Sequence, residues 1–380
     1  MRLRSVFRVR RAEAGRGLPA RVRRWPGDRR SCAGARARGR GGASVSAADG
    51  ATRAPGSGRA RADERAAPGA REGAGTVEFC GLRLAHRVIN GSGTFDVVAA
   101  RAVFGAALDE RFPFAAYVSK TITLEPRAGN PPPRLWEAAQ GLINSIGLPN
   151  KGLEAYMDED VPALASLTTE VPAGPAAGTS RVAVPLVTNV MGSTAEELVE
   201  LVDACHERAE ISAVELNVSC PNVKTGLDIG ADPVLLEHVV RATRERTSKP
   251  LVVKLTPNAA DVPACARAAQ AGGADAVSLI NTLRAMALTP PARGERRHPW
   301  LGGGTGGLSG PALRTVALAQ VAAVAESVSV PVIGMGGVEN TAHARDLIDA
   351  GAALVAVGTE NFRDPAAAAR IARDLAETGL

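Results

Sequence analysis

The sequence predicts an α/β protein whose core is a (β/α)8 TIM barrel, with eight parallel strands at the centre and helices outside them. Two observations lead to this fold class. From Thr76 onward, short apolar runs alternate with longer stretches of helical periodicity, which is the pattern of parallel strands joined by helical crossovers. Eight such runs occur. A single barrel of roughly 250 to 300 residues fits within the chain.

Several of the candidate strands are β-branched runs bounded by Pro or Gly, as strands buried on both faces are. In chain order the candidates are residues 87–90, 116–121, 185–190, 213–218, 251–255, 276–281, 331–334 and 354–358. Between them, residues 195–207 and 341–350 are amphipathic and predict helices. Residues 171–180 are rich in Pro, Ala and Gly without periodicity, so we expect a surface loop there.

The first 75 residues differ in composition from the rest. They hold 19 Arg, no Lys and six acidic residues, a balance of +13, which leaves −7 for the other 305 residues of a chain with net charge +6. Such a segment cannot offset its ordering entropy by burial, so we expect 1–75 to be a disordered extension and 76–380 to be the barrel domain. An RNA-binding arm, an organelle presequence and a start placed too far upstream stay open as explanations. The acidic barrel argues against a nucleic-acid partner.

The five cysteines include no CxxC pair, and in a large chain this predicts reduced thiols. Cys205 and Cys265 lie on predicted helices and are expected to be core thiols. The Cys205–His206 pair lacks the spacing of metal ligands, so we expect no metal. No run approaches the roughly 18 apolar residues of a membrane span. We therefore expect a cytoplasmic protein without a membrane partner.

Nearly every candidate strand ends in a group that can bind or react. Each such residue alone is also explained as a turn residue that ends a strand. However, chemistry in a parallel barrel takes place at the C-terminal ends of its strands, and so many polar ends predict one shared site. In chain order they are Ser92, Lys120, Thr121, Asn189, Asn217, Asn222, Lys254, Asn281, Thr282, Gly336, Gly337, Gly358 and Thr359.

These residues lie in segments that resemble the class 1 dihydroorotate dehydrogenases, most closely the class 1B catalytic subunit. The resemblance spans about Thr76 to Phe362, and its most specific phrases are "NSIGLPN" and "NVSCPN". Further matching segments are "SKTITLEPRAGNPPPRLWE", "VVKLTPN", "SLINTLRAM", "GGLSGPAL", "VIGMGGVEN" and "AVGTENF". The resemblance implies an FMN-dependent enzyme of pyrimidine biosynthesis that oxidises dihydroorotate to orotate.

This reaction removes a proton from one carbon and a hydride from its neighbour, so the site needs a base opposite the flavin. The resemblance assigns the base to Cys220, which enters a loop that can close over the substrate. An electropositive site would lower the thiol pKa from its usual ~8.5. The resemblance also assigns the binding of orotate, a planar anion, to amide and ammonium donors. These substrate-binding residues are Lys120, Asn144, Ser145, Ile146, Gly147, Leu148, Asn217, Asn222, Asn281 and Thr282.

For the flavin, the most informative residue is Lys254, because a lysine inside an apolar strand is costly unless an anion pairs with it. Negative charge that develops on reduced flavin supplies that partner. We expect the phosphate at the glycine turns after the last two strands. The remaining members of the implied FMN set are Ser92, Lys120, Thr121, Asn189, Asn217, Ile280, Gly310, Gly336, Gly337, Gly358 and Thr359.

The run "GGGTGG" at residues 302–307 has GxGxxG spacing but does not follow a strand, so we interpret it as a mobile loop near the flavin phosphate and not as a dinucleotide fold. The class 1B resemblance implies a homodimer core and an FAD and iron–sulfur partner subunit, in a heterotetramer that passes electrons to NAD. A class 1A enzyme linked to fumarate and another FMN barrel acting on reduced pyrimidines are the alternatives. A silent phosphate-binding barrel is disfavoured, since it needs neither Cys220 nor Lys254.

Overall fold

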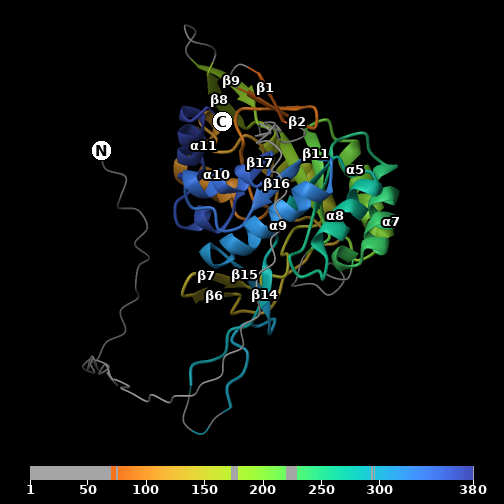
Figure 1. Cartoon of the computed structure of the whole chain (residues 1–380), viewed down its shortest axis with the longest axis vertical. Helices are drawn as coiled ribbons and strands as arrows, with labels where there is room; N and C mark the ends of the chain where they lie inside the picture. Colours follow the sequence, from red (N-terminus) through yellow and green to blue (C-terminus); the bar gives the residue numbers. More distant parts are fainter. Residues whose placement is uncertain are drawn as a thin grey trace, which may run out of the picture. The chain divides into compact units, whose positions relative to one another are not determined.

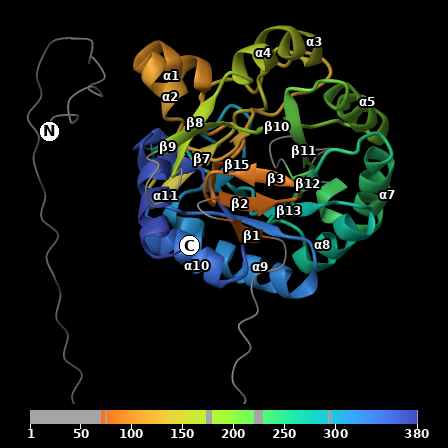
Figure 2. The same cartoon turned by 90° about the horizontal axis from the view of Figure 1, so that it is seen from above.

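A computed structural model describes residues 70–73, 76–172, 179–219, 229–291, 294 and 296–379. Its centre is one sheet of eight parallel strands, surrounded by helices (Figure 1, Figure 2). The predicted TIM barrel is therefore confirmed. Each strand overlaps a predicted run and extends beyond it by at most two residues. In spatial order they are β4 (Val88–Asn90), β17 (Leu354–Val357), β16 (Val332–Met335), β13 (Ala276–Leu279), β12 (Leu251–Lys254), β11 (Ile211–Asn217), β10 (Leu186–Val190) and β5 (Tyr117–Val118).

A buried amide bridges the seam between the first and last strands of this sheet. Asn90 at the end of β4 donates from Nδ2 to Val118 O (2.7 Å) and accepts from Val118 N at Oδ1 (2.8 Å). One backbone bond, from Ala115 N to Val88 O (2.9 Å), lies below it. Because an amide offers both a donor and an acceptor, Asn90 replaces a rung of the ladder that short β5 does not provide.

Five of the surrounding helices in the described ranges begin at an Asp, Thr or Asn that caps main-chain N–H groups. Thr194 and Asn340 accept from main-chain N–H groups at the starts of the two helices that the sequence predicts, and each helix ends one residue before its predicted end. Cys205 and Cys265 are buried on α5 and α8, as expected. The helices are α1 (Val97–Phe104), α2 (Ala106–Glu110), α3 (Leu153–Ala155), α4 (Val161–Leu164), α5 (Ala195–His206), α7 (Pro233–Arg244), α8 (Val262–Ala271), α9 (Arg314–Ser327), α10 (Thr341–Asp349) and α11 (Ala367–Glu377), with shorter turns η1 (Tyr156–Asp160), η2 (Pro311–Leu313) and η3 (Thr359–Phe362).

The N-terminal end of the barrel is covered by a three-stranded antiparallel sheet. It contains β1 (Ala70–Gly73), β2 (Thr76–Phe79) and β3 (Leu82–Leu84), and its apolar side chains join the barrel interior in one buried cluster. The composition places 70–73 in the expected disordered extension, yet these residues pair with β2. Antiparallel pairing uses main-chain groups, which composition does not report. Residues 1–69 lie outside the described part of the chain.

Two smaller sheets correct the sequence interpretation. Strands β8 (Thr168–Pro172) and β9 (Thr179–Ala183) form a hairpin, so the ends of the expected loop 171–180 are paired, and 173–178 are not described. A four-stranded sheet has the order β14 (Leu283–Ala285), β15 (Gly306–Ser309), β7 (Gly141–Asn144) and β6 (Leu135–Ala138). The end of "GGGTGG" belongs to β15, and a Cβ on Gly307 would lie 1.9 Å from Thr282 Oγ1. The last two residues of the expected loop are therefore paired in a strand, and the mobility expected of residues 302–305 stays a prediction.

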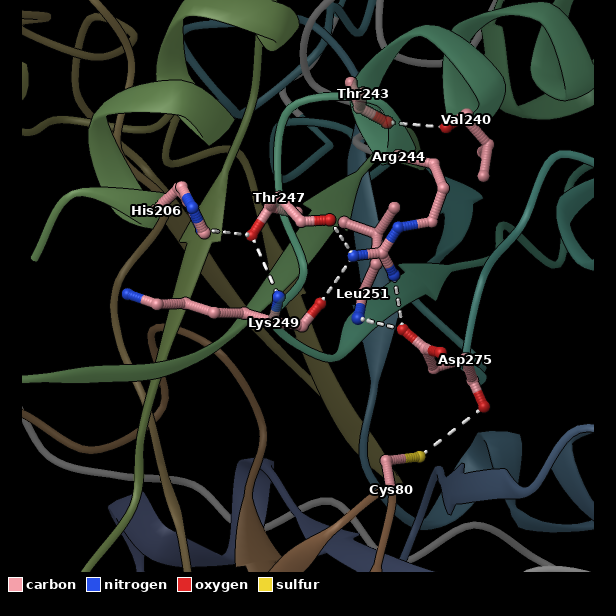
Figure 3. Close-up of polar contacts among 9 residues, drawn as sticks. All are labelled: Cys80, His206, Val240, Thr243, Arg244, Thr247, Lys249, Leu251 and Asp275. Atoms are coloured by element: carbon pink, nitrogen blue, oxygen red, sulfur yellow. Dashed lines mark hydrogen bonds and ion pairs between the residues drawn. The ribbon is translucent and has the colours of Figure 1, made fainter. Parts of the chain in front are cut away.

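A cluster of polar side chains forms hydrogen bonds around the first residues of strands at the N-terminal end of the barrel (Figure 3). Asp275 Oδ2 accepts from Arg244 Nη1 (2.6 Å) and from Leu251 N (2.8 Å), and Arg244 also donates to Thr247 O and to Lys249 O. Nearby Cys80 borders an open hollow of about 320 Å³. Burial, together with the charge of Asp275, raises the pKa of the Cys80 thiol to about 12, which keeps it protonated. The hydrogen bonds of Asp275 and Arg244 thus connect the end of α7 with the starts of β12 and β13.

No helix in the described ranges is long and apolar enough to cross a membrane.

Candidate active site

Polar side chains from three strands meet at the C-terminal end of the barrel in one hydrogen-bonded chain. Asn217, at the end of β11, donates from Nδ2 to Thr121 Oγ1 (3.0 Å) and accepts at Oδ1 from Ser219 Oγ (3.1 Å). Asn281, just beyond β13, donates to Ser219 Oγ (2.8 Å) and accepts from Thr282 N (2.8 Å). The structure thus brings together four residues that the sequence assigns to the site, and Ser219 connects them.

Lys254 lies on β12, between β11 and β13, and its amine has no partner among the described residues. In register it pairs with Asn217 on β11 and with Ser278 on β13. Its side chain is only 6% exposed, and no described residue forms a hydrogen bond or an ion pair with its Nζ. A buried ammonium group without a partner is strongly unfavourable. The arrangement therefore suits an electron-rich ligand group above the barrel.

One layer deeper, Asn189 leaves a second polar atom unsatisfied. It is fully buried on β10, and its Nδ2 donates to Glu215 Oε2 (2.6 Å). Its Oδ1 is buried and accepts from no described residue. Glu215 is 3% exposed and accepts at Oε1 from Ser278 Oγ (2.6 Å). Sequence reasoning missed Glu215 and Ser278, although the charge inside the apolar run "AVELNV" is the same signal that identified Lys254.

Glycine turns lie at the ends of β16 and β17. Gly336 and Gly337 have φ of 134° and 71°, which only glycine adopts easily. A Cβ on Gly337 would lie 2.8 Å from Arg314 Cβ, so this turn also packs closely. Gly310, with φ of 92°, follows β15, and its Cβ would lie 3.6 Å from Thr359 Cγ2. Gly310 and Thr359 are therefore neighbours, as members of one binding site must be.

The first strands contribute the other edge of this site. Ser92 Oγ donates to Ser119 O (2.8 Å), which joins the loops after β4 and β5. A Cβ on Gly91 would lie 3.7 Å from Gly358 Cα, so the loop after β4 adjoins the turn after β17. Ile280 is buried just beyond β13. Together with the residues above, these positions encircle one end of the barrel.

The predicted substrate loop 144–148 follows β7. Asn144 donates to Gly307 O (3.2 Å), and Gly307 packs against Thr282. Thr282 N donates to Asn281, so the loop adjoins the hydrogen-bonded chain of Asn217, Ser219 and Asn281, which we call the amide chain. Ser145 is buried and accepts at Oγ from Asn130 Nδ2 (3.0 Å). The Asn130 N–H donates to Ile146 O. The next two residues, Gly147 and Leu148, have positive φ angles of 77° and 56°. A non-glycine residue in this region is strained, as is common at binding loops.

The other predicted substrate ligands are placed less completely. Lys120 is exposed just after β5. It lies near Gly93, since a Cβ added to Gly93 would be 4.0 Å from Lys120 Cγ. Cys220 and Asn222 lie outside the described residues. Ser219 immediately precedes Cys220 and is fully buried, so the described part of the chain shows where the Cys220 loop begins. Among the described side chains, no three of His, Cys, Asp or Glu form a group that could hold a metal ion.

Comparisons with known proteins assign the family. The family model described as dihydroorotate dehydrogenase matches residues 75–378. The chain is 41% identical over 301 residues to the dihydroorotate dehydrogenase B (NAD(+)) catalytic subunit of Geobacter sp. (strain M21), covering 79% of this chain and 91% of the relative. It is 43% identical over 306 residues to the protein of that name from Desulforudis audaxviator (strain MP104C), with coverage of 79% and 90%.

A solved structure supports the fold. The dihydroorotate dehydrogenase of Eimeria tenella, crystallised with ferulenol, is similar with a TM-score of 0.61 at 22% identity, over 83% of this chain and 86% of that chain. At this identity the likeness concerns the barrel alone. The extent of the family match and the identity of the relatives decide the assignment. The chain therefore belongs to the dihydroorotate dehydrogenase family, flavin-dependent oxidoreductases that oxidise the CH–CH bond of dihydroorotate to orotate in pyrimidine biosynthesis.

Proposed function

We propose that this chain is the FMN-binding catalytic subunit of a class 1B dihydroorotate dehydrogenase. One observation carries the FMN assignment: the catalytic end of the barrel contains the buried Lys254 side chain, whose amine binds no described residue, and, one layer below, the buried acceptor Asn189 Oδ1, which also has no partner among the described residues. Buried polar groups are almost always satisfied. A ligand with both an electron-rich edge and an N–H donor completes them.

The residues fit FMN. A flavin ring offers carbonyl and ring-nitrogen acceptors to Lys254 and a ring N–H to Asn189. Gly336, Gly337 and the Gly358–Thr359 turn offer backbone amides without bulky side chains to the terminal phosphate. Ser92, Lys120, Thr121, Asn217, Ile280 and Gly310 complete the proposed FMN-binding set. When bound, FMN accepts the hydride that leaves dihydroorotate.

Removal of the substrate proton is assigned to Cys220. Its loop begins at Ser219, whose hydroxyl is held between Asn217 and Asn281. Because Ser219 is anchored by these two asparagines, the position of the adjacent Cys220 thiolate relative to them is restricted. The thiolate takes the proton from the carbon next to the ring carbonyl, on the face opposite the flavin.

The substrate is assigned to the amide chain, to Lys120 and to the loop 144–148. Asn217 donates one hydrogen bond and accepts one, so its amide keeps a second hydrogen and a second lone pair for the carbonyl and N–H groups of the ring. Asn281 accepts one hydrogen bond at Oδ1, which keeps a second lone pair for a ring N–H. Exposed Lys120 supplies a cation for an anionic ligand. Asn144, Asn222 and Thr282 are assigned as further donors.

The electron acceptor is proposed to be NAD, reached through a partner subunit that carries FAD and an iron–sulfur cluster, in a heterotetramer built on a homodimer of this chain. The names of the relatives, which specify NAD(+) and a catalytic subunit, support the acceptor and the existence of a partner subunit. We expect the purified chain to hold one noncovalent FMN and to reduce NAD weakly, and to reduce NAD strongly once the partner subunit is added.

Absorbance spectra and steady-state assays of the purified chain test both parts. A colourless protein that takes up no FMN on reconstitution contradicts the cofactor assignment. Robust fumarate reduction by the chain alone contradicts the class 1B assignment and favours the fumarate-linked class.

A further inference from the structure

Glu215 is a buried acid that the proposed reaction does not use. It lies in the middle of β11, is 3% exposed, and borders a small hollow in the barrel interior that is otherwise lined by apolar residues and Pro250. Both carboxylate oxygens accept short hydrogen bonds, from Asn189 Nδ2 on β10 and from Ser278 Oγ on β13, each at 2.6 Å. A buried acid is costly, so an acid with two dedicated donors in an apolar layer requires an explanation.

The carboxylate decides which way the Asn189 amide faces. A carboxylate accepts hydrogen bonds and does not donate them, so only the NH2 group of Asn189 can face Glu215. The amide oxygen must then point away from Glu215, and this oxygen is the buried atom without a partner in the described structure. Were Glu215 apolar, the amide could turn over and present its NH2 group instead.

We propose that Glu215 is a positioning residue that fixes the Asn189 amide so that Oδ1 accepts a hydrogen bond from the imide N–H of the flavin ring. The inference rests on the proposed FMN site and adds to it a residue that does not touch the flavin. Ser278 donates to the second carboxylate oxygen and so offsets part of the cost of burying the Glu215 side chain. The imide N–H lies between two carbonyl groups of the ring, and an acceptor at this point recognises it whether the flavin is oxidised or reduced.

The test is a double-mutant cycle on FMN affinity, measured on flavin-free protein by the quenching of FMN fluorescence. Glu215→Met removes the acceptor but keeps an unbranched chain, and Asn189→Leu removes the amide. We expect each single variant to bind FMN at least about tenfold more weakly, the factor for one lost hydrogen bond. Because Glu215 acts through Asn189, the double variant should lose no more than either single variant.

Two further variants separate orientation from stability. Glu215→Gln can still accept from Asn189 and donate to Ser278, so its FMN affinity should stay within about threefold of the parent. Ser278→Ala removes the other donor, and it should lower the melting temperature while FMN affinity again stays within about threefold. The probe 3-methyl-FMN lacks the imide N–H. The parent should prefer FMN over it by at least about tenfold, and Glu215→Met should reduce this preference below about threefold.

Additive losses in the cycle, or an unchanged preference between FMN and 3-methyl-FMN, would overturn the inference. If Glu215→Met does not fold, Glu215→Gln decides, because its amide allows both orientations of Asn189 at similar cost and a tenfold loss there would overturn the inference. Failure of the parent to bind FMN would remove the proposed function and the inference together. Binding by the parent with an additive cycle would remove the inference alone.

Discussion

Replacing Lys254 by Met should have opposite effects on the stability of the flavin-free protein and on its affinity for FMN. The side chain is 6% exposed and its amine has no partner among the described residues. The flavin-free barrel therefore bears the desolvation cost of an unpaired ammonium group. A methionine of similar length removes this cost, and we expect the free energy of unfolding to rise by about 1 to 3 kcal/mol. In a domain of this size that corresponds to roughly 2 to 4 °C per kcal/mol in melting temperature.

The same substitution removes a charge-assisted hydrogen bond to the flavin. We expect FMN affinity to fall by about 1.5 to 3 kcal/mol, or roughly 10- to 150-fold. Thermal unfolding of the flavin-free protein and fluorescence titration with FMN measure the two effects separately. Lys151→Met is the matched control, since Lys151 is exposed and ion-paired with Glu159, and both quantities should change by less than about 0.5 kcal/mol. A flavin-free Lys254→Met protein that melts at lower temperature than the parent would refute the reasoning.

Three predictions concern stability. Burial lowers the pKa of His86 from 6.5 to about 4, so as the pH falls below 6.5 the unfolded chain is protonated first. The free energy of unfolding should therefore be insensitive to this group above pH 6.5 and fall by roughly 2 to 3 kcal/mol down to pH 4. Urea unfolding across this range should show the loss, and His86→Gln should reduce it; an equal loss in the variant would exclude His86 as its source. Asp275→Ala removes the hydrogen-bond partner of Arg244 and of Leu251 N, and should lower the free energy of unfolding by about 1 to 3 kcal/mol. FMN affinity should stay unchanged, because this cluster lies at the other end of the barrel, and weaker FMN binding would contradict that separation. Deleting residues 1–69 should preserve the melting temperature and FMN binding, whereas deleting 1–74 removes β1 and should lower the melting temperature; equal melting temperatures for the two truncations would contradict a stabilising role for β1.

The barrel was predictable from the sequence because buried parallel strands leave a direct signal. Runs such as "LVAV" at residues 354–357 are apolar along their length, and each of the eight runs overlaps a strand. The pairing of 70–73 and the hairpin at 168–183 were not predictable, since antiparallel main-chain pairing needs no apolar pattern. The role of Asn90 at the seam depends on which strands come to lie at the ends of the sheet.

The candidate site was predictable in part. Lys254 was identified because its charge conflicts with its strand, and the structure finds it buried. Glu215 presents the same conflict, but only the structure shows that it binds Asn189 and leaves Oδ1 free. Which residues share a layer of the barrel depends on register between strands, and one sequence does not report register. The placement of Cys220 and Asn222 stays a prediction.

The most direct test of the central claim is anaerobic reduction of the bound flavin by dihydroorotate, followed by stopped-flow absorbance. The parent should lose its flavin absorbance and release orotate. Cys220→Ala should be slower by roughly 10² to 10⁴, the usual contribution of a positioned general base. Cys220→Ser should remain slow with a rate that keeps rising at alkaline pH, since a hydroxyl is harder to deprotonate than a thiol. Orotate should still perturb the flavin spectrum of each variant, which separates lost chemistry from lost binding. A parent flavin that dihydroorotate does not reduce would contradict the account, and a Cys220→Ala protein that reduces its flavin at the parental rate at every pH would show that another group is the base.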